Sequence, residues 1–451
     1  MSHERSGFSS RIGFVLATAG SAVGLGNIWR FPYLAAKYGG GSFLLIYLIL
    51  TLTFGFTLMI TEVALGRKSG TSALGAFGHF RKKYAFIGVL TTFIPFIIFP
   101  YYCVIGGWVT KYTVVSLQGK VHAAASDSFF PEFIGKTAEP LVYLIIFLLI
   151  TTIVVAFGVK GGVERVSTFM MPVLIVLLIG VSVFCITRPG AMEGVIYYLK
   201  PNLKDLGPTT FLAALGQLFY SMSLAMGIMI TFGSYMPKNS DLEKSVTQVE
   251  CFDTGVAFLA GLMIVPAVFV FSNGDASMLA KGPSLMFVML PKVFDSMAFS
   301  NGIAAVFFIL VLFAALTSSI SLLETLVAVV TDRFHVKRIT ACITLFCIAL
   351  LMAVPSSLGY GIWDHITILG FSFLDFFDFL SNSVLMPIAA FLTCIFVAYI
   401  IKPQVIVDEI EGSGSFHRKS LFLVMIKYIA PICILAILAF SVLEGMGIIT
   451  V

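Results

Sequence analysis

The sequence predicts an all-α integral membrane protein that crosses the bilayer about eleven times. Of its 451 residues, 59% are hydrophobic and only 11% are charged, and the mean hydropathy is +1.01. A typical soluble domain carries about 25% charged residues, whereas runs of about 20 apolar residues match the thickness of the hydrocarbon core. A β-barrel would need short segments of alternating polarity. This composition also excludes disordered, nucleic-acid-binding and secreted disulfide-rich proteins. We therefore expect the protein to lie in a lipid bilayer, and we expect no nucleic-acid partner.

Apolar segments follow one another along the chain, and each is long enough to form most or all of a membrane-spanning helix. Charged or glycine-rich stretches separate them, such as Gly39-Gly40-Gly41 after the first and Arg67-Lys68 after the second. The two longest segments must tilt or project beyond the membrane. The segments cover residues 11–36, 42–66, 86–117, 141–158, 167–187, 209–236, 248–271, 301–331, 339–354, 366–400 and 421–448.

Positive charges in the loops predict the orientation of the chain. With the N-terminus inside, the inner loops hold about twice as many Lys and Arg residues as the outer loops. We therefore expect a cytoplasmic N-terminus and, with an odd number of helices, an outer C-terminus. Arg5 and Arg11 before the first apolar run resemble a signal peptide, but no A-x-A-like site precedes a mature soluble domain. Residues 408–419, which include Gly412-Ser413-Gly414-Ser415, are expected to form a flexible cytoplasmic linker.

The first and sixth apolar segments carry small and hydroxyl-bearing residues where a membrane helix is normally apolar. These stretches read Ala19-Gly20-Ser21-Ala22-Val23-Gly24-Leu25-Gly26-Asn27 and Tyr220-Ser221-Met222-Ser223-Leu224-Ala225-Met226-Gly227. One interpretation is close helix packing, because Gly20 and Gly24 form a GxxxG pair. The other is a break in each helix, because unwound backbone is tolerated in a membrane only where it lines a cavity or a ligand. A broken helix offers free amides to a carboxylate and free carbonyls to a cation or an ammonium group.

The two stretches occupy corresponding positions if the first ten helices form two five-helix halves. On this layout a single transporter domain, residues 1–451, holds helices 1–5 at about 11–187, helices 6–10 at about 209–400 and an extra helix at about 421–448. Paired interruptions in inverted repeats are the best sequence indication of a transporter's binding site. The symmetry is inferred from the layout, because no residue-level repeat joins the halves.

Several long motifs are spread over nearly the whole chain. They are GSAVGLGNIWRFP at 20–32, GGG at 39–41, TEVALG with Glu62, Tyr101-Tyr102 six residues before Trp108, GQLFYSMSLAMG at 216–227, ALTSSIS at 315–321 and FDFLSNSVLMP at 377–387. In these motifs and in their order, the sequence resembles the neurotransmitter:sodium symporter family, and more closely its bacterial amino-acid transporters. The resemblance implies the LeuT fold, with a five-plus-five inverted repeat and interrupted helices 1 and 6.

The same resemblance implies two sodium sites made of oxygen atoms, which suit a hard cation. The first site would be completed by the carboxylate of the substrate, and its protein ligands would be Ala22, Asn27, Ser221 and Asp253. The second would lie between helices 1 and 8, with the ligands Gly20, Val23, Ala314, Thr317 and Ser318. Helical hydroxyls such as those of Thr317 and Ser318 also commonly bond back to their own backbone.

Asp253 departs from the family pattern, which commonly has Asn at this position. Chloride-dependent members have Ser four residues further on, where this chain has Ala257. A fixed carboxylate together with a missing chloride ligand predicts transport that requires no chloride. A carboxylate in mid-membrane costs roughly 2.5 to 3.5 kcal/mol, which favours a cation or a proton beside it. An Asp at a wet helix end is the alternative.

The resemblance also implies a site for an amino acid. Amine-transporting relatives carry Asp where this chain has Gly24, so the substrate is expected to bring its own carboxylate. The amides of Leu25 and Gly26 and the hydroxyl of Tyr102 would bind that carboxylate. Carbonyls of Ala22, Tyr220 and Ser223 would accept the ammonium group. The rest of the expected pocket consists of Ser21, Ile98, Tyr220, Ser221, Ser223, Ala225, Met226, Ser319 and Leu322.

These pocket side chains are apolar with a few hydroxyls, which indicates a hydrophobic or aromatic L-amino acid. Relatives that accept aromatic substrates tend to carry Gly-Met-Gly where this chain has Ala225-Met226-Gly227. The choice between aliphatic and aromatic substrates stays open.

Two gates follow from the resemblance. The outer gate would pair Arg30 with Asp378 above the substrate, with Tyr220 as a lid, and Asp375 is one helical turn from Asp378. Partners that separate and rejoin provide bistability and need not add stability. The inner gate would pair Arg5 with Asp332, near Tyr235 and Glu324, with Phe8 as an apolar plug where relatives usually have Trp.

Gly162 and Pro172 match the family's Gly-x9-Pro element in helix 5. Pro removes a backbone donor and disrupts the preceding turn, so unwinding there would admit cytoplasmic water to the second sodium site. A simple proline kink is the alternative.

Together these features predict a symporter of the bacterial inner membrane. It would import the amino acid with two sodium ions by alternating access. A channel or a non-transporting sensor of the same fold is one alternative, and concentrative uptake in vesicles would distinguish a transporter from both. A proton-coupled transporter is the other, and uptake driven by a pH gradient without sodium would support it. An enzyme is not indicated, because no HExxH, GxSxG or Cys/His cluster is present. The sequence leaves the oligomeric state open.

Overall fold

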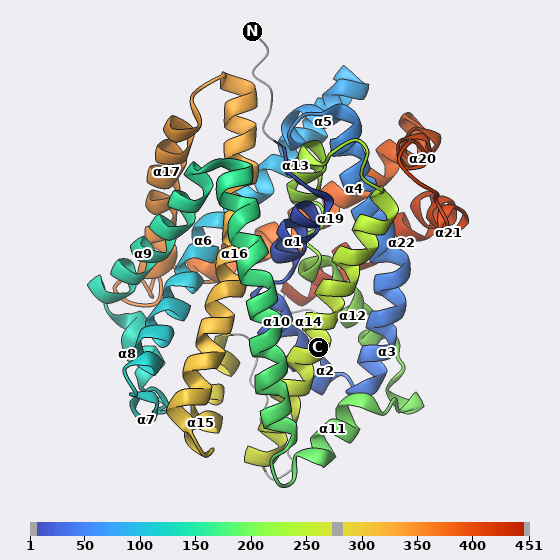
Figure 1. Ribbon diagram of the computed structural model, residues 1–451. Helices are drawn as coiled ribbons and strands as arrows, with labels where there is room; N and C mark the ends of the chain where they lie inside the picture. The colour runs from blue at the N-terminus through green and yellow to red at the C-terminus, as the bar shows by residue number, and fades with distance from the viewer. Residues whose placement is uncertain (1–6, 273–282, 446–451) are drawn as a thin grey trace.

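A computed structural model describes residues 7–272 and 283–445 of the chain as a bundle of helices (Figure 1). Among these residues, nine helices are long and apolar enough to cross a membrane, and one bent helix pair adds a tenth span. The remaining predicted segment is α12 (Pro208–Ser221) followed by α13 (Ile228–Tyr235), two helices that are each too short to span alone. The all-α membrane architecture with about eleven spans is therefore confirmed.

The first half of the chain supplies five spans. Its elements are α1 (Arg11–Ala22), η1 (Gly26–Arg30), α2 (Phe31–Lys37), α3 (Gly41–Leu50), η2 (Thr51–Gly55), α4 (Phe56–Ser69), α5 (Ala73–Phe80), η3 (Lys82–Tyr84), α6 (Ala85–Leu117), α7 (Val121–Ala124), α8 (Phe129–Gly135), α9 (Ala138–Ala156), η4 (Val159–Glu164) and α10 (Arg165–Ile186). The π-helical turns η1, η2 and η4 lie inside the spans, and such turns are frequent at functional sites.

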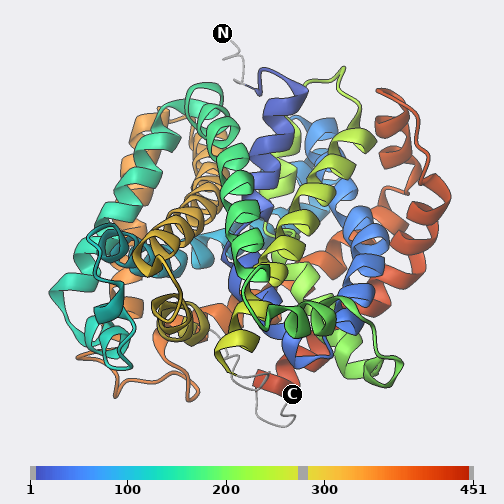
Figure 2. The same ribbon diagram turned by 60° about the horizontal axis from the view of Figure 1, so that its bottom comes forward.

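The second half supplies the other spans. Its described elements besides α12 and α13 are α11 (Ala191–Leu199), η5 (Leu203–Asp205), α14 (Leu242–Phe271), η7 (Leu285–Met289), α15 (Leu290–Asp295), α16 (Ser300–Phe334), α17 (Arg338–Leu358), α18 (Phe373–Asp378), η8 (Phe379–Leu385), α19 (Met386–Ile395), η9 (Phe396–Ile400), α20 (Gln404–Glu411), α21 (Lys419–Val424), η10 (Met425–Ile429) and α22 (Ala430–Gly445). Helices α7, α8, α11 and α15 gather at the end opposite the start of α1, and Figure 2 turns that end toward the viewer.

Both predicted helix interruptions are present. Helix α1 ends because Val23 is extended, with φ −71° and ψ 100°, and the chain bends by 57° before it continues. Between α12 and α13, Ser223 and Ala225 have φ values of 52° and 62°. A non-glycine residue in this left-handed region costs about 1 to 3 kcal/mol and is kept only where its surroundings enforce it. The strain therefore marks the second break as a built feature.

Helix α13 packs against α4 with backbone on backbone. A Cβ atom on Gly66 would overlap the carbonyl oxygen of Ile230, and one on Gly233 would overlap that of Val63. Small residues allow this close approach between membrane helices.

The expectation of a flexible linker at residues 408–419 is wrong for its first part. Helix α20 continues to Glu411, and the Glu409 carboxylate lies 2.9 Å from the guanidinium of Arg67 in α4. The backbone amide of Arg418 donates to Glu243 of α14 at 3.0 Å. The Gly and Ser residues suggested flexibility, but charged residues on either side of them fasten the segment to the bundle.

Candidate functional site

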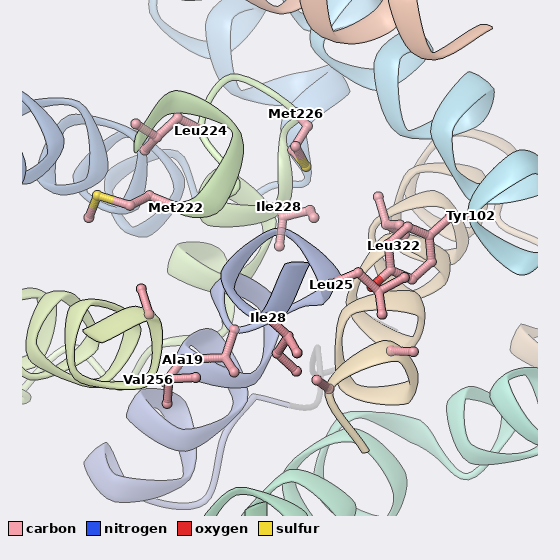
Figure 3. Close-up of a cluster of buried hydrophobic side chains, with 14 of the residues drawn as sticks. Ala19, Leu25, Ile28, Tyr102, Met222, Leu224, Met226, Ile228, Val256 and Leu322 are labelled. Atoms are coloured by element: carbon pink, nitrogen blue, oxygen red, sulfur yellow. The ribbon is translucent and has the colours of Figure 1, made fainter. Parts of the chain in front are cut away.

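The two helix breaks lie against one another and line a single buried cavity. Its wall consists of Ser21, Ala22, Gly24, Leu25, Gly26, Asn27, Ile98, Tyr102, Tyr220, Ser221, Ser223, Met226, Ile228, Ser318 and Leu322. Figure 3 shows Leu25 at the break of the first span, with Tyr102 and Leu322 on one side of it and Ile228 and Met226 on another. Most of the expected substrate pocket is thus brought together.

Two expected pocket residues do not line this cavity. The left-handed backbone at Ala225 turns its amide toward Glu62 Oε1, at 2.7 Å. The Ser319 hydroxyl lies 2.8 Å from the hydroxyl of Thr151 in α9, and Ser319 is not part of the cavity wall. Ile228 does line the cavity, and sequence reasoning missed it because an Ile at the start of a membrane helix carries no distinguishing signal.

The cavity holds polar groups that are free to meet a ligand. The hydroxyls of Ser21 and Tyr102 are buried, and neither has a hydrogen-bond partner among the described residues. A Cβ atom on Gly24 would lie 2.8 Å from Ser318 Oγ and 3.4 Å from the Tyr102 hydroxyl. The absence of a side chain at Gly24 therefore keeps this polar corner open. Because the wall also includes the apolar side chains of Leu25, Ile98 and Met226, the cavity suits a molecule with one polar and one apolar end.

The first oxygen cluster consists of the side chains of Asn27, Ser221 and Asp253. The Asn27 amide nitrogen donates to Asp253 at 2.7 Å and to the Ser221 hydroxyl at 2.9 Å, and that hydroxyl donates to Asp253 at 3.0 Å. Asp253 is fully buried, and no ion pair joins it to a described Lys, Arg or His residue. Three of the four residues expected at the first sodium site therefore meet, and Ala22 lines the adjoining cavity.

Tyr47 of α3 also reaches this cluster. Its hydroxyl donates to Asp253 Oδ2 at 3.4 Å, and its side chain is fully buried. Sequence reasoning missed Tyr47, because a single Tyr in a long apolar run is ordinary in a membrane helix.

The second oxygen cluster joins the break in the first span to α16. The Ser318 hydroxyl lies 3.4 Å from the carbonyl oxygen of Gly20 and 3.2 Å from that of Val23. Thr317 instead donates to carbonyls of its own helix, at 3.1 Å for Ala314. Ser318 therefore lies beside Gly20 and Val23, as expected for the second sodium site. In this conformation the Thr317 hydroxyl bonds back to its own helix, which was the alternative interpretation.

The two charged residues expected to form the outer gate, Arg30 and Asp378, are not in contact. Arg30 makes no ion pair with Asp378, and its guanidinium lies 5.1 Å from the ring centre of Tyr220. Asp378 accepts hydrogen bonds from Asn382 at 2.6 Å and from Tyr101 at 3.2 Å. The alternative partner, Asp375, accepts from the Ser372 hydroxyl at 2.7 Å.

The opposite end is tightly packed. The Phe8 ring lies edge-on to those of Phe14 and Phe232, with centres 5.7 Å and 5.6 Å apart, and its amide donates to the Tyr235 carbonyl at 3.0 Å. Arg5, its expected neighbour at the inner gate, lies outside the described residues.

The acidic residues at this end are engaged. Asp332 accepts from the Ser72 amide at 3.0 Å. Glu324 accepts from the Tyr235 hydroxyl at 2.9 Å and forms an ion pair with Arg338. Arg338 was not among the expected gate residues.

Gly162 lies in the π-helical turn η4, and Pro172 lies inside α10. At the end of η4, Glu164 accepts from the amide of Ser9 at 2.8 Å and from its hydroxyl at 2.5 Å. The irregular start of the fifth span is thereby fastened to the segment that precedes α1. A Cβ atom on Gly13 would overlap Glu164, so α1 can approach this carboxylate only without a side chain there.

Comparison with known proteins identifies what this arrangement belongs to. The family model described as the sodium:neurotransmitter symporter family matches residues 5–133 and 125–447. The chain belongs to the sodium:neurotransmitter symporter family. Members of this family are transporters and not enzymes, so the chain is a sodium-dependent symporter and a multi-pass membrane protein.

Individual members of the sodium:neurotransmitter symporter family match along nearly their full length. A sodium-dependent transporter of Bacillus subtilis is 35% identical over 438 residues, which cover 95% of this chain and 96% of the relative. One from Haemophilus influenzae is 33% identical, covering 96% and 97%. The crystal structure of MhsT in complex with L-phenylalanine matches with a TM-score of 0.87 at 37% identity, over 97% of this chain and 99% of that one. The predicted LeuT fold is thereby confirmed.

Proposed function

We propose that this chain, working as one transporter unit over residues 1–451, imports a hydrophobic or aromatic L-amino acid together with two sodium ions and without chloride. The observation that carries the proposal is the pair of unpartnered buried hydroxyls, Ser21 and Tyr102, in a cavity that is also lined by apolar side chains. Burying a hydroxyl without a hydrogen-bond partner costs about 1 to 3 kcal/mol of free energy. A polar group of the substrate would offset this cost by bonding to it. The binding of L-phenylalanine by MhsT is consistent with an aromatic substrate.

In this proposal the substrate carboxylate lies at Gly24, Leu25 and Gly26 and accepts from the Tyr102 hydroxyl. The ammonium group faces the carbonyls of Ala22, Tyr220 and Ser223. The side chain of the substrate then contacts the apolar residues Ile98, Met226, Ile228 and Leu322. Met226 is flexible and can adapt to side chains of different shape.

The first oxygen cluster would hold one sodium ion. Among the described residues, its buried carboxylate, Asp253, has no cationic side chain beside it, and burial of an unpaired charge is strongly unfavourable. The Asn27 amide nitrogen lies where a cation would compensate that charge, so binding would require the amide to turn and present its oxygen. The fixed charge of Asp253 would replace chloride, which supports chloride independence.

The second oxygen cluster would hold the other ion between Gly20, Val23, Ala314, Thr317 and Ser318. All of these offer neutral oxygen atoms, which suit a hard cation. Each sodium ion that enters down a membrane potential of 100 mV would contribute about 2.3 kcal/mol, or roughly fifty-fold accumulation of a zwitterion.

Alternating access would use the two ends of the bundle. The packed Phe8 plug and the separated Arg30 and Asp378 fit a conformation that is closed at the end holding Phe8 and open to rearrangement at the other. Approach of Arg30 to Asp378 would close the outer end. Release of Ser9 from Glu164 and unwinding at Gly162 would open the inner one, in a bacterial inner membrane with the N-terminus in the cytoplasm and the C-terminus outside.

A panel of labelled amino acids bound to the purified protein tests the proposal. Binding is measured in sodium and in potassium, each with and without chloride. We expect sodium-dependent binding of Phe, Trp, Tyr or Leu that chloride does not change. Binding that ignores sodium would overturn the mechanism and indicate a proton-coupled carrier or a sensor, and a requirement for chloride would overturn the role given to Asp253.

A further inference from the structure

A polar cleft lies at the end of the molecule where α1 begins. The segment before α1 forms one side of it, and the turn that leads into α14 forms the other. The cleft is lined by Ser9, Ser10, Arg11, Pro237, Asn239, Ser240, Asp241 and Lys244. It shares no residue with the wall of the cavity at the helix breaks, so it is a separate site.

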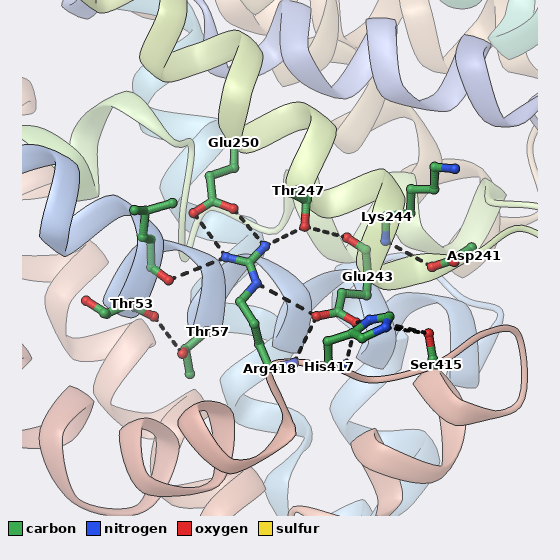
Figure 4. A network of polar contacts seen from close by, with 11 residues as sticks. Thr53, Thr57, Asp241, Glu243, Lys244, Thr247, Glu250, Ser415, His417 and Arg418 are labelled. Carbon is green, nitrogen blue, oxygen red and sulfur yellow. Dashed lines mark hydrogen bonds and ion pairs between the residues drawn. The ribbon is translucent and has the colours of Figure 1, made fainter.

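The cleft carries two cationic side chains without partners. Among the described residues, neither the Arg11 guanidinium nor the Lys244 ammonium group makes a hydrogen bond or an ion pair. Some other cations are paired, as Arg418 is with Glu250 at 3.0 Å. Figure 4 shows this contrast, with Arg418 inside a network of bonds and the Lys244 ammonium group pointing away from it.

One carboxylate, Asp241, also lines the cleft, and it is already in use. Asp241 Oδ1 accepts from the Lys244 amide at 2.9 Å and so caps the start of α14. Ser10 likewise caps α1 by accepting from the Gly13 amide at 3.0 Å. Because both helix starts are capped by their own side chains, the free positive charge of the cleft comes from Arg11 and Lys244.

Two of the remaining polar side chains, Asn239 and Ser10, can donate hydrogen bonds into the cleft. The Asn239 amide has no partner among the described residues, and the Ser10 hydroxyl keeps its own proton while it accepts from Gly13. With two cations and one carboxylate, the wall has a net charge of about +1. It therefore matches an anion with several oxygen acceptors and a single negative charge.

We propose that this cleft binds a phosphate group, carried by an anionic phospholipid or present as free phosphate. Guanidinium and ammonium groups donate charge-assisted hydrogen bonds to phosphate oxygens. The positive charges in the loops predict that this end faces the cytoplasm, where basic residues attract anionic lipid headgroups. The proposal does not depend on which amino acid the protein transports.

The test measures phosphatidylglycerol binding to the full-length protein by native mass spectrometry. A second arm measures inorganic phosphate binding by calorimetry in a neutral detergent. The variants are Arg11→Gln with Lys244→Gln, and separately Asn239→Asp, which adds a negative charge and leaves both cations in place. The matched control is Lys82→Gln with Lys83→Gln, which removes two exposed cations that lie outside the cleft. Thermal unfolding checks that each variant folds.

We expect the double cleft variant to bind phosphatidylglycerol about 30-fold more weakly, because each basic residue near the surface contributes about 1 kcal/mol. Asn239→Asp should also weaken binding, and the control should match the wild type. The same pattern with inorganic phosphate alone would assign the cleft to the free anion and support the shared chemistry. Equal binding of both ligands by the wild type and the cleft variants, or an equal loss in the control, would overturn the proposal.

Discussion

The two oxygen clusters flank the same helix break, yet they differ in charge. The first contains the buried carboxylate of Asp253, which accepts hydrogen bonds from Asn27 and Ser221. The second contains only carbonyls and hydroxyls, centred on Ser318. Neutral dipoles can satisfy one another, whereas a buried carboxylate without a cation keeps most of its desolvation cost. Cation binding should therefore be governed more strongly by the first cluster.

The clusters also join different parts of the bundle. The first connects η1, α12 and α14 around the cavity, whereas the second connects the break only to α16. We therefore expect changes in the first cluster to act on sodium and substrate together, and changes in the second to act mainly on sodium.

The largest expected effect comes from Asp253→Ala, which removes the charge that distinguishes the first cluster. Hydrogen bonds to charged groups contribute about 1.5 to 3 kcal/mol each, so sodium-dependent binding should weaken at least about 100-fold. Sodium titration of labelled amino-acid binding measures this. Asp364→Ala, at an exposed loop position, is the control. An unchanged sodium dependence in the Asp253 variant would remove that residue from the site.

Gly24→Ala should disturb both clusters and the cavity between them, because the added methyl group would lie 2.8 Å from Ser318 Oγ. Overpacking of this kind costs about 1 to 3 kcal/mol, so amino-acid binding should weaken about 30-fold. Equilibrium binding at saturating sodium measures the loss. Gly216→Ala is the control, because its added methyl group would meet nothing within 4 Å. If both variants bind equally well, Gly24 does not keep the corner open.

Ser318→Ala tests the neutral cluster alone. It removes the hydroxyl that faces Gly20 and Val23 while Asp253 keeps its partners, so the sodium affinity should fall about tenfold. Ser182→Ala provides the comparison, because its hydroxyl bonds to the carbonyls of Leu178 at 2.7 Å and Leu259 at 3.0 Å, and neither belongs to the cluster. A loss as large as that of Asp253→Ala would contradict the ranking of the clusters.

The smallest effect is expected for Tyr47→Phe. The bond to Asp253 is long at 3.4 Å, so its loss should weaken sodium binding about threefold. Tyr198→Phe, which loses a bond of 3.1 Å to the Phe258 carbonyl and none to Asp253, should leave sodium binding unchanged. A loss of tenfold or more at Tyr47 would make this hydroxyl a main partner of the carboxylate.

Composition and local pattern predicted the spans, because each is encoded within about 20 neighbouring residues. The local pattern alone left the helix breaks open against close helix packing. The corresponding positions of the two stretches and the family resemblance favoured the breaks. The meeting of Asn27 with Ser221 and Asp253 could not be predicted from the local pattern, because 194 and 226 residues separate them. Only the family resemblance brought them together.

The misses have local physical reasons. Ala225 was placed in the pocket from the family resemblance, but its left-handed conformation turns its amide toward Glu62. The linker before the last helix was misjudged because its anchors, Arg67 and Glu243, lie in distant segments.

The contact between α4 and α13 has a mechanical consequence. At Gly66 and Gly233 no side chain separates the two backbones. A movement of one helix therefore cannot be absorbed by side chains that change rotamer. The first residue of α13, Ile228, lines the cavity. A rotation of α13 would therefore be transmitted directly to α4. Arg67 of α4 forms an ion pair with Glu409 of α20. The same rotation would therefore also displace α20, the helix that precedes the last span.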